Sequence, residues 1–109
     1  MNIPFFPFEI IDWDSIPKEE HKGETGFATW QVLNVGNIRI RKLQYFPNYK
    51  ANHWCKKGHI IHCIQGEMNT ELDDGRVMKL TADKTYIVGD DCEAHRSSTE
   101  TGCVLFVVD

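Results

Sequence analysis

Short runs of alternating apolar and polar residues fill most of the chain, and glycine or asparagine separates one run from the next. The runs are rich in Val, Ile, Tyr, Phe and Trp, and none keeps a helical period for three turns. The pattern predicts strands at Phe27–Leu33, Ile38–Phe46, Ala51–Cys55, His59–Gln65, Met68–Leu72, Val77–Leu80, Thr85–Val88, Ala94–Ser98 and Cys103–Val108. Short strands at this density are typical of an all-β fold, a small barrel or sandwich.

Turn residues lie where these runs end. Asp74–Gly75 is a strong hairpin signal between two of the expected strands, and Gly36–Asn37 separates the first two. Gly66 is expected to end the strand that begins at His59.

The start of the chain differs, because it carries three prolines and alternates little. We expect residues 1–26 to form an extended arm and residues 27–109 to form the barrel domain. Exposing a large apolar side chain costs about 1.5–3 kcal/mol, so those of the arm require a cover. They are Phe5, Phe6, Phe8, Ile10, Ile11 and Trp13. Burial on the same barrel is the simpler expectation, and a homodimer in which arms or edge strands pair is the other.

Length and charge limit the function. A chain of 109 residues is enough for one domain. Its formal net charge is -4 and its basic residues are scattered, which argues against nucleic acid. Its first residues do not resemble a secretory signal, and no stretch approaches a membrane span. We expect a cytoplasmic protein without a membrane partner, whose cysteines are thiols or ligands rather than disulfides. These are Cys55, Cys63, Cys92 and Cys103.

Potential metal ligands gather within a few residues. His53, Cys55 and His59 lie close together, and His95 follows one strand pair later. His53 and Cys55 share a face if their segment is a strand, and His59 joins them if it opens the neighbouring strand. Imidazole and thiolate are the donors that zinc and similar metals prefer, so the set predicts a mononuclear site. Each residue alone is more often a hydrogen-bonded core histidine or a small core cysteine.

Other polar residues have two interpretations. Arg39 and Arg41 share one strand face. They either lie on a solvated outer face or form salt bridges to acidic residues, or one of them enters the barrel mouth and binds a substrate carboxylate. His62 has the opposite parity to His59 and is expected to face away. Cys63 is expected to pack deeper in the barrel.

These residues resemble the motifs of the cupins, small β-barrels whose first motif is His-x-His, three or four residues, Glu, six residues and Gly. Here His53, Cys55, His59 and Gly66 keep that spacing, with cysteine at the second histidine and histidine at the glutamate. His95 resembles the histidine of the second cupin motif. The resemblance runs from about residue 39 to the end and implies a single jelly-roll-like cupin barrel.

The run His53-Trp54-Cys55 followed by Gly58-His59 more closely resembles the small DHCW-motif cupin fold proteins, with asparagine for the aspartate. That group is named for its motif and not for an activity. The resemblance implies a divalent metal held by His53, Cys55, His59 and His95. Zinc is the first choice, and iron, nickel or copper would also suit these donors.

Three functions remain open, each with a small molecule in the barrel. A metal-dependent enzyme would polarise a carbonyl or carboxylate-bearing substrate, or activate water or oxygen. A non-catalytic cupin would bind or sense the metal or a small ligand. A metal-free thiol enzyme would use Cys55, activated by His59 or His53.

Overall fold

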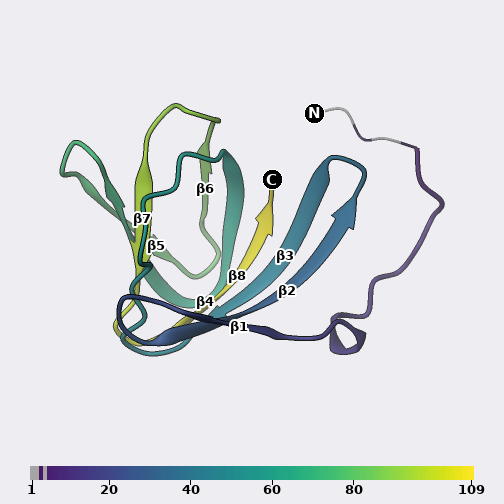
Figure 1. Cartoon of the computed structure of the whole chain (residues 1–109), viewed down its shortest axis with the longest axis horizontal. Coiled ribbons are helices and arrows are strands. Elements are labelled where there is room, and N and C mark those ends of the chain that lie inside the picture. Colours follow the sequence, from purple (N-terminus) through teal and green to yellow (C-terminus); the bar gives the residue numbers. More distant parts are fainter. Residues whose placement is uncertain (1–2, 4) are drawn as a thin grey trace.

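The computed structural model of the chain describes residue 3 and residues 5–109. Its strands lie in two layers that curve around a common interior (Figure 1). The elements in chain order are a 3-10 turn η1 (Trp13–Ser15), then β1 (Glu19–Lys22), β2 (Phe27–Val35), β3 (Ile38–Tyr45), β4 (His59–Leu72), β5 (Val77–Thr81), β6 (Thr85–Val88), β7 (His95–Ser98) and β8 (Cys103–Val108). The predicted all-β fold class is confirmed.

One long strand joins the two layers. The first layer has the order β1-β2-β3-β8-β4, and β6 pairs with the first half of β4. The second half of β4 pairs with β5 and β7, and every pairing is antiparallel. The register shifts between Cys63 and Gln65, and Gly66 has a φ of 80° that other residues rarely adopt. The glycine therefore turns β4 from one layer into the other.

The strand prediction is wrong at two places and incomplete at a third. β4 is one continuous strand, because Gly66 bends it and does not end it. Residues 51–55 form no strand. The segment lies beside β7 and forms backbone hydrogen bonds to it only near its ends, from Ala51 N to Ser97 O at 2.9 Å and between Cys55 and His95. Within the expected arm, β1 pairs with β2.

The interior is filled by every second residue of the paired strands. Leu43, Leu105 and Cys63 lie side by side on β3, β8 and β4, at most 2% exposed. Cys63 therefore packs inside, as expected. His62, one position earlier, faces outward and its Nδ1 lies 2.8 Å from Thr85 Oγ1, which confirms its predicted direction.

The N-terminal arm runs away from the two layers (Figure 1). Phe5, Phe8 and Ile10 are 101%, 95% and 83% exposed, so the barrel of the same chain does not cover them. Trp13 is different, because its ring meets the Phe106 ring edge-on at 6.4 Å on the outer face of β8. Among the described residues, no helix has the length and apolar character to cross a membrane.

Candidate metal centre

The barrel interior becomes polar toward one end, and strand register explains why. Two positions beyond Leu43 and Leu105, Arg41 and Val107 form the next interior pair on β3 and β8. One step further, Arg39 and Asp109 exchange backbone hydrogen bonds of 2.6 and 2.9 Å. His59 begins β4 two residues before the buried Ile61. The period of two therefore carries arginine, aspartate and histidine to the mouth of the barrel.

Backbone pairing brings Cys55 and His95 to the same place. The Cys55 N–H donates to His95 O at 2.8 Å, and the His95 N–H donates to Cys55 O at 2.9 Å. Directly paired residues in an antiparallel bridge project to the same side, so thiol and imidazole share a face. His59 belongs to the half of β4 that pairs with β6 and β8, not to a strand beside residues 51–55. The expectation that Cys55 and His59 lie on adjacent strands is therefore wrong.

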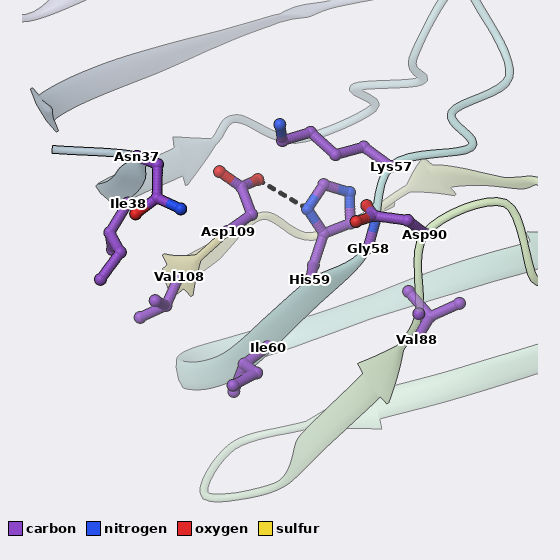
Figure 2. A pocket seen from close by; sticks show the side chains of 11 residues that line it. Asn37, Ile38, Lys57, Gly58, His59, Ile60, Val88, Asp90, Val108 and Asp109 are labelled. Carbon is purple, nitrogen blue, oxygen red and sulfur yellow. Dashed lines mark hydrogen bonds and ion pairs between the residues drawn. The ribbon is translucent and has the colours of Figure 1, made fainter. Parts of the chain in front are cut away.

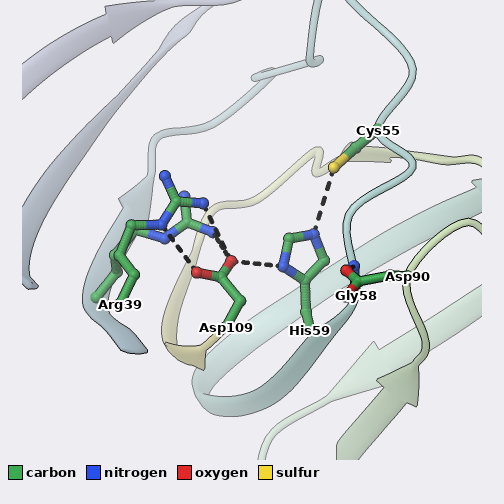
Figure 3. Close-up of polar contacts among 7 residues, drawn as sticks. Arg39, Cys55, Gly58, His59, Asp90 and Asp109 are labelled. Atoms are coloured by element: carbon green, nitrogen blue, oxygen red, sulfur yellow. Dashed lines mark hydrogen bonds and ion pairs between the residues drawn. The ribbon is translucent and has the colours of Figure 1, made fainter. Parts of the chain in front are cut away.

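Three potential ligand atoms converge here. One donor atom each of Cys55, His59 and His95 lies within 4.8 Å of the others. Cys55 Sγ is 3.4 Å from His59 Nε2 (Figure 3), and the two imidazole rings are nearly perpendicular, with centroids 5.1 Å apart. Both histidines are buried, at 8% and 3% exposure. A thiol and two imidazoles at this spacing form a suitable donor set for a divalent metal.

The second nitrogen of each ring fixes the orientation of the first. His59 Nδ1 lies 2.7 Å from Asp109 Oδ2, and His95 Nδ1 donates to Glu93 O at 2.8 Å. Because carboxylate and carbonyl oxygens accept hydrogen bonds, both Nδ1 atoms carry the proton and both Nε2 atoms keep a lone pair. His95 Nε2 is buried and has no hydrogen-bond partner. An ion between these atoms would satisfy it, so the residues fit a metal.

Asp109 is the centre of a charged cluster that the sequence analysis missed. Its carboxylate accepts from Arg39 Nε at 2.8 Å and Arg41 Nη2 at 2.9 Å, and also contacts His59 (Figure 3). Burial opposes its ionisation, but the Arg39 hydrogen bond and the Arg41 charge prevail and lower its pKa to about 2. Burial lowers the pKa of His59 despite Asp109, which keeps this imidazole neutral and able to bind a metal. Asp109, Arg39 and Arg41 all lie outside the histidine motif in sequence.

His53 lies apart from the other expected ligands. It is exposed, its Nδ1 lies 2.7 Å from Asn52 Oδ1, and it lines the same cavity without joining the three convergent donors. The shared parity expected of His53 and Cys55 requires a strand, and this segment bends at residues 52 and 53 instead.

A cavity of about 250 Å³ adjoins the three donors inside the barrel. Its wall comes from both layers and includes three tyrosines and three arginines besides the histidines and Cys55. Arg39 and Arg41 thus line the mouth of the barrel, and the solvated outer face is the wrong interpretation, although their salt bridges to Asp109 are present. Burial raises the pKa of Tyr45 and Tyr86 far above the usual range, so both phenols stay protonated.

A second hollow, of about 620 Å³, lies against His59 and Asp109 from another direction. Figure 2 shows Lys57, Asp90 and Val108 in its wall with the His59–Asp109 pair. Gly58 N donates to Asp90 Oδ1 at 2.7 Å, which ties the loop before β4 to the loop after β6. His59 therefore lines both hollows, whereas Asp109 lines only this second one.

No family model matches the chain, and no curated protein matches it. Solved structures do match. The polyketide cyclase RemF from Streptomyces resistomycificus gives a TM-score of 0.77 at 19% identity, over 94% of this chain and 78% of that one. A predicted oxalate decarboxylase from Thermotoga maritima gives 0.77 at 15% identity, over 92% and 96%. An RmlC-like cupin from Shewanella frigidimarina NCIMB 400 gives 0.75 at 17% identity, over 94% and 89%.

The chain has the cupin fold. The expected cupin barrel is thereby confirmed, and at these identities the likeness concerns the fold. Within this fold, Cys55, His59 and His95 come from the positions that carried the motif resemblance. Asp109 and Trp30 are additional site residues, for which a period of two counted along β2, β3 and β8 was the available signal, and Arg41 is one of the two arginines considered for the barrel mouth.

Proposed function

We propose that this cupin is a small metal-dependent enzyme that acts on a small molecule bound in its barrel cavity. The observation that carries the proposal is the convergence of Cys55, His59 and His95, with a buried and unpartnered Nε2 on His95. Catalytic metal sites usually have three protein ligands and an open position, whereas structural zinc sites have four. Three convergent donors beside a cavity fit the catalytic type.

Zinc is the metal we propose first, because thiolate and imidazole suit it, and iron, nickel or copper are the alternatives. A bound divalent metal would supply Lewis acidity toward a carbonyl or activate water. The chain's own residues would orient that chemistry. Asp109 and the Glu93 carbonyl hold the two rings, and the apolar floor closes the cavity below. His53 is a fourth ligand in the proposal only if its ring leaves Asn52.

A second candidate follows from one contact. Cys55 Sγ lies 3.4 Å from His59 Nε2, which is the arrangement of a thiol beside its base. A metal-free thiol enzyme would use the same two residues, and His95 would then have no assigned role. The four cysteines are free thiols in the described part of the chain, which is compatible with the reducing cytoplasm that we propose as its compartment.

Metal content separates the two candidates. We would purify the protein without chelating resin, measure its metal by mass spectrometry, and titrate the metal-free form with zinc. One equivalent should bind, and His95→Ala should lose it. His62→Ala is the matched control, because His62 lies on β4 but faces outward toward Thr85. Metal retained by His95→Ala would refute the ligand set, and a protein that takes up no metal but carries a reactive Cys55 thiolate would favour the thiol enzyme.

A further inference from the structure

The cavity wall has an excess of positive charge. Among the fifteen described residues that line it, three carry guanidinium groups and none carries a carboxylate. Asp109 is shared by Arg39 and Arg41, so one carboxylate faces two guanidinium groups. Arg96 pairs with the partly exposed Glu71 at 3.4 Å. Arg41 is only 5% exposed, and a buried charge without full compensation favours an anionic ligand.

The same wall holds hydrogen-bond donors with no acceptor. Arg41 Nε, Arg96 Nε and Trp30 Nε1 are buried and have no partner in the described part of the chain. All three groups belong to residues that line the cavity. Guanidinium and indole nitrogens donate and do not accept. A ligand that satisfies them must therefore bring acceptor oxygens.

Aromatic rings hold two of these arginines in place. The Arg41 guanidinium carbon lies 4.6 Å from the centre of the Trp30 ring, and that of Arg96 lies 4.7 Å from the centre of the Trp54 ring. Stacking occupies the face of a guanidinium group and leaves its edge for paired hydrogen bonds to a carboxylate. A group fixed in this way loses little freedom when a ligand binds.

The position and size of the cavity narrow the ligand further. Asp109 Oδ2 contacts both Arg41 Nη2, at 2.9 Å, and His59 Nδ1, at 2.7 Å. The guanidinium group and the ligand imidazole are thus two hydrogen bonds apart. A cavity of 250 Å³ has the volume of about eight water molecules in the liquid, which limits the ligand to roughly that many non-hydrogen atoms.

We infer that the cavity binds a small oxo or hydroxy acid. Its carboxylate would pair with Arg41, and its oxo or hydroxy oxygen would reach the metal held by Cys55, His59 and His95. This inference rests on the proposed function for the second contact only. Arg96 and the Trp30 indole provide further donors for the same acid.

The test compares acids with their neutral amides. Zinc-loaded and zinc-free protein would be titrated calorimetrically with pyruvate, lactate and glyoxylate, and with pyruvamide and lactamide as uncharged counterparts. At least one acid should bind ten times or more tightly than the amides. Arg41→Lys keeps the charge but loses the paired geometry, and should weaken the acid about tenfold or more. Arg76→Gln is the control, because Arg76 is half-exposed on the hairpin after β4.

Zinc content of each variant separates the two proposals. If Arg41→Lys keeps its zinc but binds the acids less tightly, the inference is supported. Acid binding that Arg41→Lys leaves unchanged, equal binding of acids and amides, or binding of none of them would overturn it while zinc binding stands. If no form binds zinc, the proposed function fails, and acid binding that depends on Arg41 in the zinc-free protein still supports the anion site.

Discussion

Replacing Asp109 by asparagine should weaken both the metal site and the fold, by different amounts. The Asp109 side chain is 1% exposed and serves Arg39, Arg41 and His59 together. Asparagine keeps the size of the group but removes its charge. Its NH2 group would also face the N–H donors of Arg39, Arg41 and His59. Removing one partner of a buried ion pair costs about 3–5 kcal/mol. We expect the unfolding free energy of the variant, measured with urea, to fall by about this much.

The effect on the metal is separate. A carboxylate that orients a ligand histidine typically contributes 10- to 100-fold to metal affinity, or about 1.4–2.7 kcal/mol. Ligand linkage makes this measurable, because zinc stabilises the folded state by an amount that depends on its dissociation constant. The difference in unfolding free energy between zinc-loaded and zinc-free protein should therefore shrink by about 1.4–2.7 kcal/mol in Asp109→Asn.

Urea unfolding with and without buffered free zinc gives both quantities, and a chelator competition gives the affinity directly. Asp83→Asn is the matched control, because its side chain is 99% exposed and its φ of 66° suits asparagine. The reasoning is refuted if Asp109→Asn loses stability but binds zinc as tightly as the wild type. That result would make the carboxylate a partner of the arginines alone.

Three further predictions follow. A cobalt-substituted protein should show a thiolate-to-cobalt absorption band that Cys55→Ser abolishes and Cys92→Ser keeps; a band that survives in Cys55→Ser would remove the thiolate from the ligand set. Gly66→Ala should lower the unfolding free energy by more than the roughly 1–2 kcal/mol that a left-handed backbone costs a non-glycine residue, because the added Cβ would overlap a backbone carbonyl. Gly75→Ala has open space around it and should cost only that amount. Equal costs at the two positions would argue against the crowding at Gly66. Burial raises the pKa of the Cys103 thiol to about 12. Its contribution to the unfolding free energy is therefore complete below the pKa of an unfolded cysteine, about 8.5, and is lost as the pH rises from that pKa toward the folded one. Unfolding free energy should fall there by up to about 1.4 kcal/mol per pH unit, and Cys103→Ala should flatten the slope; an unchanged slope would assign it to the buried tyrosines.

The alternating pattern was enough to predict most strands and the fold, because each residue type then matches one side of a layer. It was not enough for residues 51–55, where Asn52 and His53 bend the backbone and only the ends bond to β7. Local pattern also could not distinguish a glycine that ends a strand from one that bends it. At Gly66 the neighbouring strands decide, since β8 pairs with β4 up to Gly66 and β5 pairs with it from Glu67 onward.

The candidate metal ligands could be predicted from the sequence, but the residues that hold them in place could not. Cys55, His59 and His95 stand in a recognisable spacing, and the structure brings them together. Asp109 is 50 residues from His59 in sequence, so only the pairing of β3, β8 and β4 puts them in contact. The burial of Arg41 likewise depends on which face of β3 turns inward, because one face carries Ile38 and Ile40 and the other carries Leu43 and Tyr45.

β4 has a consequence for how the molecule comes apart. Its fourteen residues pair with four other strands, two on each side of the bend at Gly66. Neither sheet can detach while this strand keeps its place, so opening one must disturb the other. The barrel should therefore melt as one cooperative unit, with the backbone amides next to the bend among the last to exchange with solvent.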